Sequence, residues 1–431
     1  TTYVHIGFTA SNRPAILAGK NSLDGQIEGS YRYLLMPMQF ASWLCDTWMY
    51  LSYLSLTDFR SYSSLELPLT TKTQIFLGEN GEGKTNVVEA IMFLTLLSSH
   101  RVSSTAPLIR LGAERAYIRA KVNNDGTEKL IELEINNGRA NRAKVNHNPV
   151  RSQREIVGLV KAICFSPEDL DLVRGDPSER RKFLDQITIQ HNPRMAGVIS
   201  DFERALKQRN SLLKTRAPQS SIEPWDHHLA KFGGEVIAAR LSIVASLQPH
   251  FQSSYNTISD KKIAKLDYKS SIEQATTTPH ENQELILNKI KEVSLQERER
   301  GITLVGPHRD DLLLSLGKQA VKGYASHGES WSIALSLRLA SFELLRSQDY
   351  EPILILDDVF SELDEKRRAK LVQVANNTEQ TFITVAVAND LPDEISGRRF
   401  KVSSGEEIGR AHVWTPVTSG YLVCRLLLEK K

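Results

Sequence analysis

Short apolar runs alternate with stretches of helical periodicity over most of the chain, and this pattern predicts an α/β fold. Residues 75–77 and 353–356 are nearly continuous apolar runs, which favour strands that are covered on both faces of a parallel sheet. Apolar positions between 87 and 94 recur at three- and four-residue intervals and predict a helix after the first run. Residues 381–390 begin with another buried strand.

The middle of the chain has a different pattern, in which helical periodicity dominates. Residues 193–213 and 225–248 are each predicted to form a helix, with loops at 218–224 and 276–281. No heptad pattern is sustained, so a long coiled-coil arm is not expected. These positions therefore predict a compact helical segment between two α/β segments.

A glycine-rich stretch joins the first predicted strand to its helix. It reads GENGEGKT and fits the spacing G-x-x-x-x-G-K-[ST] in the strand–loop–helix context that this motif requires. Backbone N–H groups of such a loop point at phosphate oxygens, and the start of the helix adds partial positive charge. The predicted nucleotide-binding residues are Gly78, Glu79, Asn80, Gly81, Glu82, Gly83, Lys84 and Thr85. Lys84 is expected to reach the β- and γ-phosphates, and the Thr85 hydroxyl to bind Mg²⁺.

Two adjacent acids, Asp357 and Asp358, follow the second apolar run. Burying neighbouring carboxylates costs free energy unless a cation offsets their repulsion. A magnesium ion bound with ATP supplies that cation, so we expect Asp357 to act as a metal ligand together with Thr85. Asp358 and Lys84 are the predicted catalytic residues, with Asp358 orienting or deprotonating the attacking water. The alternative is an acidic turn in which Asp358 is a solvated bystander.

Upstream of these acids, the sequence SHGESWS precedes an apolar helical stripe. Ser326, Gly328 and Glu329 resemble the S-x-G-[QE] signature of ABC-type ATPases, in which the signature of one head closes over the nucleotide of another. A capped helix without such a role is the alternative. The following SELD occupies the place of an ABC D-loop. No histidine stands near the end of the strand that begins at Thr381, where most ABC ATPases carry one.

Several motifs occur together in one order: SLTDFRSYSSLEL, GENGEGKT, FSPEDLDLVRGDPSERRKFLD, LVGPHRDD, SHGESWS and LDDVFSELDEKRR. This order resembles the RecF family of SMC-like ABC ATPases, and the form SHGESWS resembles its actinobacterial branch. The resemblance implies a P-loop ABC-type head with a mixed β-sheet and an inserted, mainly helical second lobe. It implies a head formed by residues 49–161 and 301–404, with the lobe at 162–300.

The resemblance also implies a function. Members of this family act as ATP-driven homodimers on gapped or single-strand/double-strand junction DNA, with slow ATP hydrolysis. They assist loading of the RecA recombinase with RecO and RecR. The resemblance thus implies ATP and Mg²⁺ as cofactors, DNA repair and the SOS response as setting, and the cytoplasm as location. The alternative is a P-loop enzyme or NTP switch that acts on a substrate other than DNA, although no N-K-x-D guanine motif occurs.

Composition limits the nature of a DNA-binding surface. The net charge is only +3, so any basic surface must be local. The segment ERALKQRNSLLKTR is the strongest candidate, and its predicted DNA contacts are Arg204, Lys207, Arg209 and Lys214. A second basic cluster begins at Arg180. A solvated helix face explains each cluster equally well.

The remaining features concern the setting and the ends of the chain. The three cysteines are far apart and lack metal-ligand spacing, which favours a reducing compartment, and no apolar stretch approaches the roughly 20 residues of a membrane helix. Residues 1–48 resemble the C-terminal end of the DNA sliding clamp and are interpreted as a non-native leader. Residues 405–431 are interpreted as an artefactual tail.

Overall fold

The computed structural model describes residues 5–8, 14–17, 49–99, 101–102, 104–259, 262–348, 351–404 and 411–414. The chain forms two compact units, Thr1–Cys45 and Asp46–Lys431. In the first unit the described residues form a hairpin of β1 (His5–Phe8) and β2 (Pro14–Leu17). Residues 18–48 and 415–431 lie outside the described residues, so the interpretation of both ends stays a prediction.

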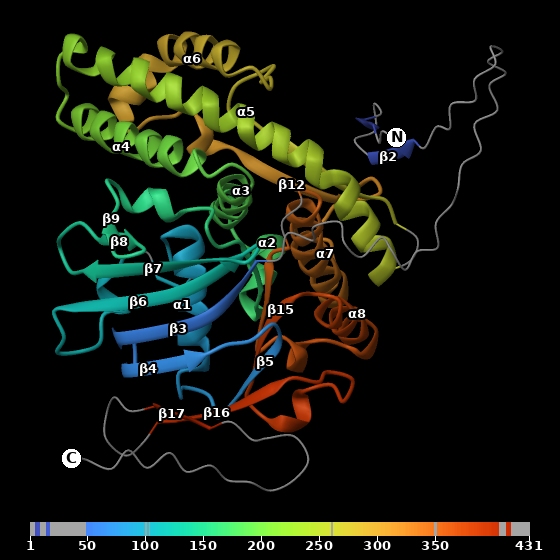
Figure 1. Cartoon of the computed structure of the whole chain (residues 1–431). Helices are drawn as coiled ribbons and strands as arrows, with labels where there is room; N and C mark the ends of the chain where they lie inside the picture. Colours follow the sequence, from blue (N-terminus) through green and yellow to red (C-terminus); the bar gives the residue numbers. More distant parts are fainter. Residues whose placement is uncertain are drawn as a thin grey trace, which may run out of the picture. The chain divides into compact units, whose positions relative to one another are not determined.

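The larger unit contains two six-stranded sheets (Figure 1). The first has the order β10-β14-β15-β5-β16-β17, and all its pairs are parallel except β16 with β17. Its strands are β5 (Lys72–Leu77), β10 (Ala162–Phe165), β14 (Ile353–Asp357), β15 (Gln380–Val385), β16 (Arg398–Ser404) and β17 (Ala411–Trp414). This is the predicted mixed sheet.

The second sheet is antiparallel throughout, with the order β4-β3-β6-β7-β8-β9. Its strands are β3 (Met49–Phe59), β4 (Tyr62–Pro68), β6 (Arg115–Asn124), β7 (Thr127–Asn136), β8 (Arg142–Val145) and β9 (Asn148–Pro149). Strand β6 alternates buried and part-exposed residues, as expected for a sheet with one face in a core and one in water.

Helix α1 (Lys84–Leu96) packs between the two sheets, which explains why nearly all of its side chains are buried. The parallel strands contribute alternate residues to different cores, because successive side chains of a strand point to opposite faces. Ile353 and Ile355 join the core around α1. Leu354 and Leu356 join the core formed with five other helices. These are α2 (Leu170–Arg174), α3 (Pro177–His191), α5 (Gln219–Ile258), α7 (His327–Arg346) and α8 (Glu365–Asn376).

A helical lobe with its own hydrophobic core projects from these sheets (Figure 1). It consists of α4 (Met195–Lys214), the first half of α5 and α6 (Pro279–Arg300). A three-stranded sheet consists of β11 (Ala264–Lys269), which lies between α5 and α6 in sequence, and of β12 (Asp311–Leu316) and β13 (Gln319–Ala320), which follow α6. The predicted inserted helical lobe is therefore present.

The predicted boundary between residues 161 and 162 is wrong. Strand β10 pairs in parallel with β14, so the residues directly after 161 belong to the head sheet. Helix α3 and the second half of α5 also pack in the head core, through Phe183, Ile187, Leu247 and Phe251. Helix α5 thus crosses from the lobe to the head, and it begins at Gln219, where a loop was predicted.

The basic helix α4 places its predicted DNA-contacting residues on two different faces. Arg204, Lys207 and Lys214 are exposed. Arg209 is buried, with 2% of its surface exposed, because α4 turns this side chain into the lobe. Its guanidinium donates to Asp226 (2.6 Å), Glu297 (2.6 Å) and the Thr303 hydroxyl (2.8 Å). The prediction that Arg209 contacts DNA is therefore wrong, since its guanidinium is buried and bonds three buried partners within the lobe. Arg180 is likewise buried against Asp311.

No helix within the described ranges has the length and apolarity needed to cross a lipid bilayer.

Replacing Arg209 tests this structural role. The Arg209→Ala variant leaves two buried carboxylates without their cation, and we expect the free energy of unfolding to fall by about 3–5 kcal/mol. The matched control Lys207→Ala changes an exposed residue on the same helix and should alter it by less than about 0.5 kcal/mol. Urea unfolding followed by circular dichroism measures both values. Equal, small effects would contradict the buried network.

Candidate functional site

The glycine-rich loop lies between β5 and α1, as the sequence predicts. Gly81 and Gly83 adopt positive φ angles of 89° and 107°, which side chains other than glycine rarely tolerate. A Cβ atom on Gly78 would lie 2.2 Å from the carbonyl oxygen of Val402. The loop therefore needs its glycines both for its curvature and for its close approach to β16.

Lys84 closes this loop from the first turn of α1. Its ammonium donates to the carbonyl oxygens of Gly78 (2.6 Å) and Glu79 (2.9 Å), so it lies across the loop where phosphate oxygens could replace these acceptors. Burial lowers the pKa of Lys84, and the negative charges of Asp358 and Asp357 oppose this shift. These neighbouring acids favour the charged form that phosphate binding requires.

Asp357 ends β14 and meets the loop through a hydroxyl. The Thr85 hydroxyl donates to Asp357 Oδ1 (3.2 Å), although the two residues are 272 positions apart. The Thr384 hydroxyl donates to the same oxygen (2.5 Å) from β15. Burial raises the pKa of Asp357, and these two hydrogen bonds oppose that rise. The structure thus brings together the two predicted metal ligands, Thr85 and Asp357.

Asp358 has a different environment from its neighbour. It adopts a positive φ of 52°, a conformation that aspartate tolerates better than most residues, and it is only half-buried. Its backbone N–H donates to the hydroxyl (3.0 Å) and to the carbonyl oxygen (3.2 Å) of Thr384. The left-handed turn ends the strand at Asp358, while Asp357 stays within the sheet. The two acids therefore differ in burial, as different roles would require.

Sequence reasoning missed Thr384, which touches both acids. The sequence does place Thr384 in the buried strand 381–385. That position would identify it as a site residue only if the strand were known to lie between β14 and β5. It also missed Tyr62, whose hydroxyl donates to the Gly83 carbonyl oxygen (2.9 Å). Both residues come from strands beside the loop and not from a recognised motif.

A buried ion pair anchors α1 behind the loop. Glu89 is 0% exposed and accepts hydrogen bonds from Arg60 (2.7 and 2.5 Å) and from the Ser99 hydroxyl (2.5 Å). Burial raises the pKa of Glu89, but the hydrogen bonds from Arg60 and Ser99 outweigh it and hold the pKa below its ordinary value. Through Glu89, the helix that carries Lys84 and Thr85 is therefore fixed to Arg60, in the turn between β3 and β4, and to Ser99, which follows the helix.

The signature residues begin α7. Ser326 caps the helix: its hydroxyl accepts from the Glu329 N–H (3.2 Å), and Glu329 accepts from the Ser326 N–H (2.9 Å). Glu329 also pairs with Lys262 (2.6 Å), and the hydrogen bond from Lys262 followed by that from Ser326 lowers the pKa of Glu329 to about 2. The structure thus confirms that Ser326 caps a helix, and it shows Ser326, Gly328 and Glu329 in the first turn of that helix.

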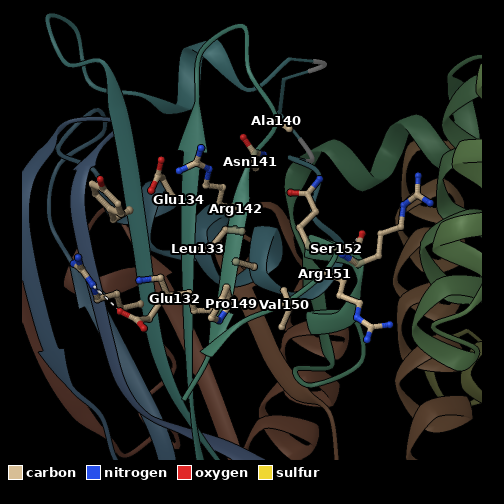
Figure 2. A pocket seen from close by; sticks show the side chains of 16 residues that line it. Glu132, Leu133, Glu134, Ala140, Asn141, Arg142, Pro149, Val150, Arg151 and Ser152 are labelled. Carbon is tan, nitrogen blue, oxygen red and sulfur yellow. Dashed lines mark hydrogen bonds and ion pairs between the residues drawn. The ribbon is translucent and has the colours of Figure 1, made fainter. Parts of the chain in front are cut away.

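One further cavity, of about 790 Å³, lies on the outer face of the antiparallel sheet (Figure 2). Its two acids, Glu132 and Glu134, lie on β7 and face Arg119, Lys144 and Arg142 on the strands to either side. Arg151 and Arg154, beyond β9, add two more bases, so the lining carries more positive than negative charge. This cavity lacks the glycine-rich loop and paired acids of the nucleotide site.

Comparisons with known proteins agree with this geometry. The family model described as RecF/RecN/SMC N terminal domain matches residues 50–405. The DNA replication and repair protein RecF of Streptomyces avermitilis is 50% identical over 369 residues, and the match covers 83% of this chain and 99% of the relative. The protein of the same name from a Nocardioides species is 44% identical over 415 residues, with the same coverage.

Solved structures are similar as well. The recombination mediator protein RecF with ATP, of the RecFOR pathway, has a TM-score of 0.76 at 28% identity, and the match covers 85% of this chain and 97% of that chain. The structure of the same description with ATPrS has a TM-score of 0.77 at 28% identity, over 85% of this chain and 98% of that one. An Smc head domain from Pyrococcus yayanosii has a TM-score of 0.51 at 14% identity and shares the fold.

The role of Lys84 is tested by Lys84→Ala. We expect nucleotide affinity to fall by about 3 kcal/mol, roughly a hundredfold in Kd, because the phosphates lose a charged hydrogen bond. Fluorescent nucleotide titration measures this, with Lys318→Ala in an exposed turn as control. Unchanged affinity in Lys84→Ala would mean that the loop does not bind phosphate.

Substitutions of Asp357 and Asp358 are predicted to have different effects on binding and hydrolysis. Asp357→Asn should weaken Mg²⁺-dependent nucleotide binding. Asp358→Asn should leave that binding intact and slow hydrolysis by about 10²–10⁴-fold, the range for a lost general base. Titration with and without Mg²⁺, together with phosphate release, distinguishes them. Identical behaviour of the two variants would contradict the division of roles.

Proposed function

Because the chain belongs to the RecF family of SMC-like ABC-type ATPases, we propose that it acts in recombinational repair as an ATP-driven DNA-binding dimer. The observation that supports this proposal is the convergence of Thr85 and Asp357 beside Lys84, an arrangement that would suit the phosphates and metal of a bound nucleotide. The alternative of a P-loop enzyme with a non-DNA substrate is not supported, since the family match spans residues 50–405.

ATP would bind with its phosphates against the loop from Gly78 to Thr85. Magnesium prefers octahedral oxygen coordination and usually takes one or two protein ligands beside phosphates and water, which suits Thr85 and Asp357. The Thr384 hydroxyl fixes one Asp357 oxygen, so the carboxylate is oriented before the ion arrives. Asp358 would orient or deprotonate the attacking water, and the metal would neutralise charge that develops on the phosphates.

A second copy of the chain would complete the site. The helix N-terminus of α7 presents an exposed capping turn with partial positive charge, which suits a γ-phosphate held by the partner. ATP would then join two heads, and hydrolysis would release them. Binding of DNA would in this way depend on the state of the nucleotide.

DNA would lie against the exposed face of α4. Arg204, Lys207 and Lys214 remain candidates there, although Arg204 also pairs with Asp201 (3.1 Å). We propose that the substrate is gapped or junction DNA, and that RecO and RecR act with this chain to load RecA. The support is family membership, and the similar solved structures are themselves described within a RecFOR pathway.

Sedimentation of the protein with and without ATP and gapped DNA tests this function. We expect a monomer without ATP, a dimer with ATP, and a dimer–DNA complex with both. A monomer under all conditions, with normal ATP binding, would contradict the proposal.

The Ser326→Arg variant tests whether the signature acts on the nucleotide of a partner. A bulky cation at Ser326 should leave ATP binding by the monomer nearly normal and prevent both dimerisation and hydrolysis. When this variant is mixed with Lys84→Ala, one composite site carries both lesions and the other carries neither, so activity should return. Heterodimers that stay inactive would show that both sites must function together or that the signature does not act in trans.

A further inference from the structure

Arg367 connects two segments that are separate in the sequence. It lies in the first turn of α8, directly after the SELD segment, Ser361–Glu362–Leu363–Asp364, that occupies the place of a D-loop. Its guanidinium reaches across to α7, the helix that carries the signature. One end of the fork donates to the Gly328 carbonyl oxygen (2.6 Å) and to the Ser332 hydroxyl (2.8 Å).

The other donors of the same side chain complete the connection. Arg367 Nε donates to the Ser332 hydroxyl (3.1 Å), and Nη1 pairs with Asp364, the N-cap of α8. The approach is close, because a Cβ atom on Gly328 would lie 3.2 Å from Arg367 Nη2. The glycine of the signature thus leaves room for this guanidinium.

The chemistry of this contact favours arginine. Only 16% of the Arg367 side chain is exposed, and Ser332 is 1% exposed, so water competes little for these donors. A planar guanidinium can bond Gly328, Ser332 and Asp364 at once, whereas a lysine ammonium is a single point on a flexible stem. Arg367 therefore fixes the distance between the signature turn and the SELD segment in a way that lysine cannot fully reproduce.

We propose that Arg367 is a positioning residue, which presents the signature and the SELD segment of one head as a rigid unit to the nucleotide of the partner head. This inference rests on the proposed function, because it assumes that the signature acts in trans. Arg367 itself need not touch ATP. Its effect is geometric, and catalysis is sensitive to misplacement of about 1 Å.

The first experiment compares Arg367→Ala, Arg367→Lys and the control Lys370→Ala, which removes a side chain that bonds Gln373 on the same helix. For Arg367→Ala we expect unchanged ATP affinity of the monomer, weakened ATP-driven dimerisation and a fall in kcat on the order of 100-fold. Arg367→Lys should be intermediate, and the control should match the unchanged protein. Full activity of Arg367→Ala, or lost ATP affinity in its monomer, would overturn the inference.

A second pair of variants removes the contact from the other helix and guards against misfolding of α8. Ser332→Ala deletes the hydroxyl that accepts from Arg367. Ser336→Ala is the matched control, because this buried hydroxyl donates within its own helix, to the Ser332 carbonyl oxygen (2.6 Å). Ser332→Ala should lower kcat and dimerisation, and combining it with Arg367→Ala should add little further loss. Equal effects of the two serine changes, or fully additive effects in the double variant, would count against the inference.

Mixing variants separates this inference from the trans model itself. Arg367→Ala mixed with Lys84→Ala should regain activity, as Ser326→Arg mixed with Lys84→Ala should. If neither mixture recovers although heterodimers form, the model in which each site acts independently in trans fails, and the inference about Arg367 fails with it. If only the Ser326→Arg mixture recovers, the trans model stands and the role of Arg367 in it is refuted.

Discussion

A single buried carboxylate, that of Asp357, connects the two halves of the head. It accepts hydrogen bonds from Thr85 on the nucleotide loop and from Thr384 on β15. Burial raises the pKa of this carboxyl group. The sheet order β14-β15-β5 allows this contact, because only one strand separates the loop from the acid, and that strand contributes a second hydroxyl, that of Thr384, to the same carboxylate oxygen. A buried acid held in this way costs free energy that a bound metal ion would recover.

The positions of the other functional groups depend on the contacts that hold the helices against this sheet. The ion pair of Glu89 with Arg60 fixes α1, and thereby Lys84, against the antiparallel sheet. Helix α7 packs on the opposite face of the parallel sheet and carries the signature at its exposed start. Arg367 then joins that start to α8. The nucleotide loop and the signature are thus held by separate contacts on one rigid core, as a site shared between two copies requires.

The sequence alone predicted the parts of the site that depend on local spacing. The glycine-rich loop, Asp357 at a strand end and the capped turn at Ser326 each follow from a few neighbouring residues, and the structure places them as predicted. Contacts between distant parts of the chain could not be predicted from the sequence. A four-residue strand such as β10 gives no signal of which sheet it joins, and the periodicity of α4 did not reveal that Arg209 meets carboxylates from α5 and α6. Thr384 and Arg367 were missed for the same reason, since their roles depend on elements that meet only in the folded chain.

The central claim is that nucleotide is enclosed between the loop of one head and the signature of another. Two chains, one with Ser326→Cys and one with Glu82→Cys, can be mixed and treated with a short bifunctional maleimide. Of the three native cysteines, Cys164 is buried, and Cys45 and Cys424 can be replaced by serine first. The account predicts a crosslinked heterodimer that forms with ATP and is lost when Lys84→Ala is added to the Glu82→Cys chain. Crosslinking that does not depend on ATP, or ATP-bound dimers in which these two positions never crosslink, would contradict it.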